Sequence, residues 1–350
     1  MGSFLLIITA VCLFIFSYYS FLLCEKKHNQ NSSDCNLILQ PINVFILLGF
    51  VGCLCCAYII PDQNDFLVPV SLWIVPAVFA SALILRIGLR PNPNNILNLL
   101  LLTVLCSVNV FLLPNDFSLT HGLLPVYAEK GILVFCWILF SWFYNILNGV
   151  DGILPLQSLS ITIGFILMYI IGIMPELYCG WNSVFVVILL SFAFFNNYPA
   201  SLSLATRDCR ILGFFIGWLI LLAAIEGNLS CALILSMYYI YEVIIATIKK
   251  LSFQKQFKIL EENTFYNYLN TLGANPKNIC ELITRINLVL MLLAGFQIYA
   301  PNEYTLVLIA FFAVFWMTFR VLSPQNEQQH ILLSGSILSA LFKRKKKKSK

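Results

Sequence analysis

The chain has 350 residues, of which 60% are hydrophobic and only 11% are charged, and its mean hydropathy is +0.86. Soluble domains carry roughly 25% charged residues, so this composition excludes a soluble globule, a disordered chain and a secreted disulfide-rich protein. It predicts an integral membrane protein. The formal net charge of +5 comes mostly from the C-terminal run 343–350, and we expect no nucleic-acid partner from it.

Continuous apolar stretches, separated by short polar connections, run from the first residues to about position 322. They lack the alternating pattern of barrel strands, and a helix that spans a membrane takes about 20 apolar residues. We therefore expect an all-α, polytopic membrane protein with about eleven transmembrane helices. In chain order, the predicted spans are 3–23, 42–60, 67–86, 96–113, 121–143, 159–174, 181–196, 210–225, 230–248, 282–299 and 304–321.

The spans form one transmembrane domain, residues 1–322, which is followed by a tail of residues 323–350. The tail contains the short apolar segment 331–342 and ends in the polybasic run 343–350. Such basic clusters are attracted to anionic headgroups at a membrane surface. We expect the tail to lie in the cytoplasm against anionic membrane lipids.

The basic residues predict the orientation of the chain. With eleven spans, all but one of the 21 Lys and Arg residues fall in the tail or in connections on the same side, and Lys130 is the exception. Cytoplasmic loops carry the excess of Lys and Arg, so the N-terminus is expected outside and the C-terminus in the cytoplasm. A wrong number of spans would scatter these charges over both sides, so the asymmetry also supports the predicted spans.

The most specific pattern in the chain follows the fifth predicted span. Asn145, Asn148 and Asp151 recur at three-residue spacing, which on a helix places all three on one face, within reach of one ligand. Gly152 follows and allows a backbone or a phosphate to approach closely. A carboxylate at the membrane edge needs a partner such as a cation. The pattern indicates a ligand site, and the alternative is a polar helix end that enters a turn.

This segment resembles the signature N-x-x-N-x-x-D-G-x-D-G of the polyprenyl-phosphate N-acetylhexosamine-1-phosphate transferases. Asn145, Asn148, Asp151 and Gly152 stand at the matching places, whereas the second D-G of the signature reads L-P here. The resemblance implies ten or eleven spans, an outside N-terminus and a site on cytoplasmic loops, which agrees with the topology predicted from the charges. It also implies the inner (plasma) membrane of a bacterium.

Weaker matches extend the resemblance over most of the chain. Glu242 stands where the family usually has an Asp, and Lys249 and Lys250 follow it as the basic pair at the cytoplasmic end of the helix. Residues 265–267, Phe-Tyr-Asn, fall on the family's histidine motif. In a third motif the family's catalytic Asp falls on Thr206, with Asp208 two residues further on.

The resemblance implies transfer of a sugar-1-phosphate from a UDP-sugar to a polyprenyl phosphate, in the synthesis of peptidoglycan, O-antigen or a related cell-envelope glycan. The two phosphate groups repel each other, so the family brings them together with Mg²⁺ held by carboxylates. On this basis Asp151 is the expected catalytic residue, and the expected metal ligands are Asp151, Asp208 and Glu242. The expected substrate-binding residues are Asn145, Asn148, Gly152, Arg86, Arg90, Arg207, Lys249 and Lys250.

Other acidic and histidine residues of the family are missing. Its Asp-Asp pair would fall near Ile87 and Gly88, and the three histidines of this chain do not stand at the places of its histidine pair. A catalytically inactive relative that keeps the fold and binds a lipid or a partner protein is therefore an alternative. A transporter is a second alternative, for which Glu242 would be the charged group near the substrate path.

Overall fold

The computed structural model describes residues 2–29, 41–59, 75–89, 96–113, 124–252, 264–271, 274–299 and 304–322. All regular structure within these ranges is helical, which confirms the predicted all-α class. Every predicted span overlaps at least one helix. In chain order, the described residues begin with α1 (Gly2–Asn29), α2 (Pro41–Ile59), α4 (Val75–Gly88), α5 (Ile96–Phe111) and α6 (Val126–Phe143).

The next element in the chain is the short 3-10 helix η3 (Tyr144–Gly149). The middle of the chain contains α7 (Ile153–Ile170), α8 (Glu176–Asn196) and α9 (Thr206–Ala223), and then the π-type turn η4 (Ala224–Asn228). The C-terminal part contains α10 (Leu229–Leu235), α11 (Met237–Ser252), α12 (Phe265–Thr271), α13 (Pro276–Gly295), η6 (Phe296–Ile298) and α14 (Tyr304–Leu322).

The lengths and compositions of these helices support a membrane-embedded protein. Five of the described helical segments are long and apolar enough to cross a bilayer, and five further apolar helices are shorter. The count of eleven spans and the orientation of the termini stay predictions. The five long segments are Val126–Gly149, Ile153–Ile170, Tyr178–Asn196, Thr206–Leu235 and Pro276–Gly295.

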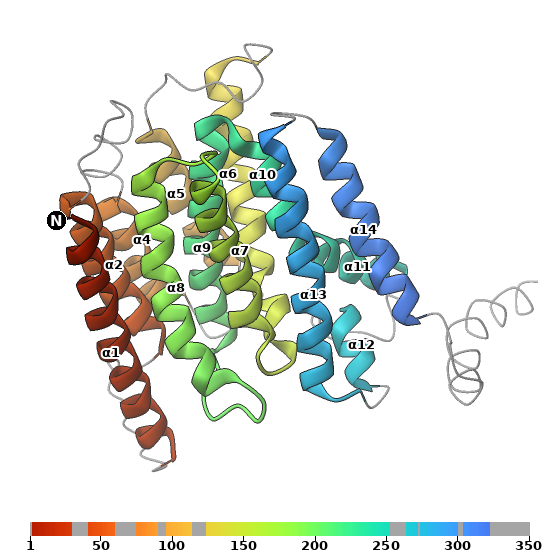
Figure 1. Ribbon diagram of the computed structural model, residues 1–350, viewed down its shortest axis with the longest axis horizontal. Helices are drawn as coiled ribbons and strands as arrows, with labels where there is room; N and C mark the ends of the chain where they lie inside the picture. The colour runs from red at the N-terminus through yellow and green to blue at the C-terminus, as the bar shows by residue number, and fades with distance from the viewer. Residues whose placement is uncertain are drawn as a thin grey trace, which may run out of the picture.

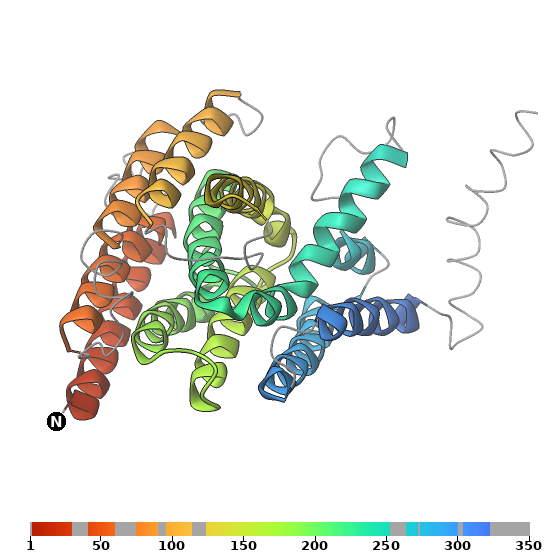
Figure 2. The ribbon, with the colours of Figure 1, turned by 90° about the horizontal axis from the view of Figure 1, so that it is seen from above.

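Helix α9 lies inside the bundle and packs against helices from both halves of the chain (Figure 1). Its neighbours include α2, α4, α6, α7 and α10. Seen from above, α1, α2, α4 and α5 form a row along one side, and α13 and α14 lie on the opposite side (Figure 2). The polar residues at the N-terminal end of α9 are therefore enclosed by neighbouring helices.

Two glycines of α9 explain its close packing against α6. A Cβ atom at Gly213 would lie 2.4 Å from Cβ of Tyr144, and one at Gly217 would lie 2.7 Å from Cδ1 of Trp137. Because these side chains face bare glycine backbone, the indole N–H of Trp137 reaches the carbonyl of Phe214 at 2.8 Å. The contact brings the end of α6, and with it η3, against the first turns of α9.

The predicted span 230–248 is not one continuous helix. It is interrupted at Ser236, which ends α10 with φ −92° and ψ 3°, and α11 starts at Met237. The Ser236 hydroxyl donates to the carbonyl of Ala232 at 2.7 Å, and serines that bond backward in this way often bend helices. After the break, α11 runs outward across the bundle instead of continuing along α10 (Figure 2).

Candidate functional site

The Asn–Asp segment forms a tight turn between α6 and α7. Tyr144–Gly149 is a 3-10 helix that ends in a kink at Asn148 (φ −92°, ψ 15°), and Gly152 starts α7 from a left-handed conformation with φ 87°. The prediction that Asn145, Asn148 and Asp151 lie on one helix face is therefore wrong, because the helix ends before Asp151. Helix α7 then begins at Ile153, earlier than the predicted span at 159.

Hydrogen bonds tie this turn to the connection between α8 and α9. The side-chain amide of Asn148 donates to the carbonyl of Leu204 at 2.8 Å. The carboxylate of Asp151 accepts from the backbone N–H of Ala200 at 3.1 Å. Asn148 and Asp151 thus both contact the segment 200–204, which lies directly before the third motif at Thr206, although the two segments lie far apart in the sequence.

Asn196 is a residue of this site that sequence reasoning missed. Its side-chain oxygen accepts from the backbone N–H of Gly152 at 3.1 Å, and its amide donates to the carbonyl of Leu202 at 2.9 Å. Asn196 is buried at the end of α8. The sequence feature that could have identified Asn196 is an amide side chain at the end of an apolar helix, because a buried amide needs hydrogen-bond partners.

The C-terminal part of the chain completes the surroundings of the turn. The thiol of Cys280 on α13 lies 3.6 Å from the carbonyl oxygen of Asp151. A Cβ at Gly149 would lie 3.0 Å from the hydroxyl oxygen of Tyr266 on α12, so Gly149 leaves the room that this phenol occupies. Three segments therefore meet at one end of the bundle: 145–152, 196–204 (directly before the third motif) and 265–267.

Glu242 is fully buried on α11 and is engaged in holding α12. One carboxylate oxygen accepts from the hydroxyl of Tyr238 at 2.6 Å, and the other accepts from the backbone N–H of Phe265 at 2.8 Å. A carboxylate at the first N–H groups of a helix stabilises the helix end. These contacts give Glu242 a structural role in which both of its oxygens have protein partners.

Asp208 forms a buried ion-pair group with arginines from two helices. One of its oxygens lies 3.5 Å from Nη1 of Arg86, at the end of α4, and 3.6 Å from Nε of Arg207 in the first turn of α9. Asp208 and Arg86 are both buried, whereas the Arg207 side chain is 31% exposed. Two of the predicted substrate-binding arginines therefore share the carboxylate that was predicted to bind metal.

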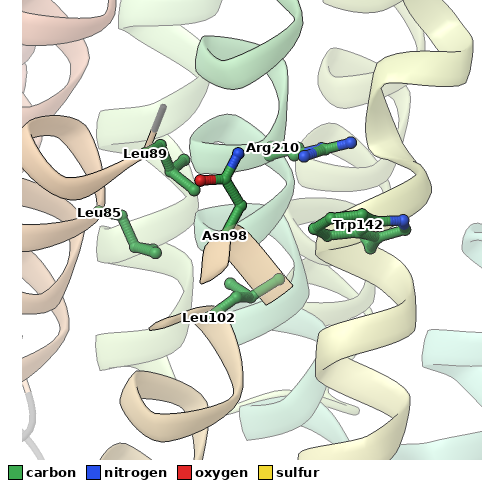
Figure 3. Close-up of a pocket in the computed structure, with 6 residues that line it drawn as sticks. All are labelled: Leu85, Leu89, Asn98, Leu102, Trp142 and Arg210. Carbon is green, nitrogen blue, oxygen red and sulfur yellow. The ribbon is translucent and has the colours of Figure 1, made fainter. Parts of the chain in front are cut away.

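Arg210 lies next to this group, with its guanidinium carbon 3.7 Å from the ring centroid of Trp142. This distance is typical of a stacked cation–π contact. Figure 3 shows the pair at a narrow apolar pocket between α4, α5, α6 and α9, with the amide of Asn98 between Leu89 and Arg210. The pocket is too narrow for a water molecule, so Arg210 and Asn98 are packed among apolar side chains.

Of the other predicted basic residues, Lys249 has a described side chain, and it contacts a different part of the bundle. The Lys249 ammonium lies 5.5 Å from the ring centroid of Tyr268, on the side of the bundle that α11 and α12 form. Arg90 and the side chain of Lys250 lie outside the described residues. Asn145, at the start of the turn, is half-buried.

The three carboxylates do not fit a shared Mg²⁺ site. Asp151 contacts the 196–204 segment, Asp208 contacts two arginines, and Glu242 contacts α12. Within the described residues, no group of three His, Cys, Asp or Glu side chains is placed to hold a metal ion. A Mg²⁺ site built from these three residues would need their separate contacts to be broken, and we derive no step through a metal.

No protein-family model and no curated protein matches this chain. The fold and composition indicate the class of the protein, which is an all-helical membrane protein with a polar cluster at one end of its bundle.

Proposed function

We propose that this protein transfers a sugar-1-phosphate from a UDP-sugar to a polyprenyl phosphate at the cytoplasmic face of a bacterial plasma membrane. The observation that supports this proposal is that the motif segments meet around Asp151. The turn that carries Asp151 contacts the loop at Ala200, the phenol of Tyr266 and the thiol of Cys280. Residues that match transferase motifs in separate parts of the sequence thus form one site.

Asp151 is the best candidate for the catalytic residue. Of the three predicted carboxylates, Asp208 and Glu242 are buried, whereas Asp151 is half-buried and reaches solvent. The Ala200 N–H fixes one of its oxygens, so the carboxylate has a set direction. In the proposed reaction Asp151 orients the lipid phosphate by accepting a hydrogen bond from its P–OH group, and Asn145 and Asn148 hold the nucleotide or phosphate beside it.

A catalytically inactive relative is the second candidate, and the arrangement of the carboxylates favours it. Asp208 and Glu242 are both engaged by protein partners. They therefore do not hold the metal ion whose positive charge a phosphoryl-transfer enzyme uses. Such a protein would keep the fold and bind a lipid or a partner enzyme. The transporter alternative depended on Glu242, which holds α12 in place, and we do not carry it further.

The experiment that separates the two candidates is a transfer assay. Membranes that contain the overproduced protein are incubated with undecaprenyl phosphate, Mg²⁺ and a series of radiolabelled UDP-sugars. An active enzyme produces a lipid-linked label that is lost in the variant Asp151→Asn and retained in the matched control Glu281→Gln, which changes an exposed carboxylate on α13. Absence of label with every sugar contradicts the transferase proposal and leaves the inactive relative.

A further inference from the structure

Arg86 carries a buried positive charge that the described residues satisfy only in part. It is 5% exposed, and its Nη1 atom pairs with Asp208 at 3.5 Å. No described residue accepts a hydrogen bond from its Nε or Nη2 atoms. Leaving donors of a charged group unsatisfied in a buried place is unfavourable, so an arginine in this state is suited to an anionic partner.

The ion-pair group has more positive than negative charge. Arg86 and Arg207 both approach the same oxygen of Asp208, so two guanidinium groups share one carboxylate. Both distances are too long for a hydrogen bond, and this oxygen has no hydrogen-bond donor among the described residues. One elementary positive charge therefore stays uncompensated within this group, where burial makes it costly.

The start of α9 adds to this positive potential and gives it access from outside. The residue before the helix is Ala205, whose side chain cannot cap the first N–H groups. A helix N-terminus carries a partial positive charge that favours anions. Arg207, in the same turn, is the partly exposed member of the group, so the group faces solvent on the side of Arg207.

We propose that Arg86, Arg207 and the first turn of α9 form a phosphate-binding site that works without a divalent cation. The buried guanidinium of Arg86 supplies the positive charge there, and the carboxylate of Asp208 offsets it only in part. Arginine suits this task because its planar fork matches two phosphate oxygens. This site rests on the proposed transferase function only in the choice of its ligands. These are a lipid phosphate and a nucleoside diphosphate, which both bind through their phosphate groups.

The test measures binding to the purified full-length protein in detergent, in the presence of EDTA. Inorganic pyrophosphate, UDP and undecaprenyl phosphate are titrated separately, so that the tightest of the three identifies the source of the phosphate. Arg86→Gln should weaken binding about tenfold to a hundredfold, since a charge-assisted hydrogen bond is lost. Asp208→Asn should strengthen binding about tenfold, because it removes the competing carboxylate.

Opposite effects of the two variants exclude general damage to the fold as the explanation. Arg207→Gln changes a partly exposed side chain, and it should weaken binding even if Arg86→Gln fails to fold. The matched controls are Arg285→Gln and Glu281→Gln, which break an exposed ion pair on α13 and should leave binding unchanged. Binding that needs Mg²⁺, or that the arginine variants do not weaken, overturns the proposal.

The transfer assay and this binding assay can fail independently. Binding in EDTA without any transfer supports the phosphate site in an inactive protein. Transfer with binding that depends strictly on Mg²⁺ supports the enzyme and contradicts the metal-free site. Absence of binding by all three ligands contradicts the site whatever the outcome of the transfer assay.

Discussion

Glu242 on α11 accepts a hydrogen bond from the backbone N–H of Phe265 at 2.8 Å, so one buried carboxylate joins α11 to the first turn of α12. Its other oxygen is held by Tyr238, one turn earlier on the same helix. In both contacts the carboxylate accepts a hydrogen bond. The arrangement explains the buried acid without a metal ion.

The variants Glu242→Ala and Glu242→Gln separate this structural role from a role in metal binding. We expect Glu242→Ala to lower the free energy of unfolding by about 1–3 kcal/mol, because it leaves a buried N–H and a hydroxyl without an acceptor. Glu242→Gln keeps one acceptor oxygen and should cost less. Thermal unfolding in detergent measures both, and a Gln variant that unfolds normally but loses an Mg²⁺-dependent activity would contradict the structural role.

The helical segments could be predicted because long apolar runs leave no other structure that satisfies the backbone in a membrane. The break at Ser236 could not, since Ser158 and Ser183 make the same backward bond inside helices that stay continuous. The direction of α11 after the break depends in turn on its contacts with α12 and α14.

The polar motif at Asn148 and Asp151 could be recognised from the sequence, but the geometry of its segment could not. The spacing of Asn148 and Asp151 indicated a polar cluster, and both residues do contact a second motif segment. That Asp151 lies beyond the helix follows from the kink at Asn148 and the extended conformation of Val150, which spacing does not reveal. The pairing of Arg86 with Asp208 joins residues from distant helices, and no local pattern predicts it.

Asp151→Asn should abolish transfer while changing stability little. The carboxylate makes one described side-chain hydrogen bond, to the Ala200 N–H, and the amide oxygen of Asn can accept it equally well. We expect the free energy of unfolding to change by less than about 1 kcal/mol. Label transfer and thermal unfolding are measured on the same preparations, and a large loss of stability would indicate that Asp151 is structural.

The orientation predicted from the basic residues can be tested by fusing a reporter after residue 322. A green fluorescent reporter should fluoresce there, since the C-terminus is expected in the cytoplasm, and an alkaline phosphatase reporter should stay inactive. The exception, Lys130, does not weaken this expectation, because its ammonium is buried and donates to the carbonyl of Leu113 at 2.8 Å. Phosphatase activity at the C-terminus would contradict a topology of eleven spans with the N-terminus outside.

Gly213→Ala should destabilise the contact between α9 and α6 that places η3 against α9. The new Cβ would lie 2.4 Å from Cβ of Tyr144 and 3.2 Å from Cα of Ser141, so backbone has to move to make room. Overpacking of this kind costs about 1–3 kcal/mol.

Gly131→Ala on α6 is the matched control, because nothing lies within 4 Å of its Cβ position. Alanine favours a helix over glycine, so this control should be neutral or stabilising by up to about 1 kcal/mol. Equal unfolding temperatures of the two variants in detergent would show that α6 and α9 do not pack through Gly213.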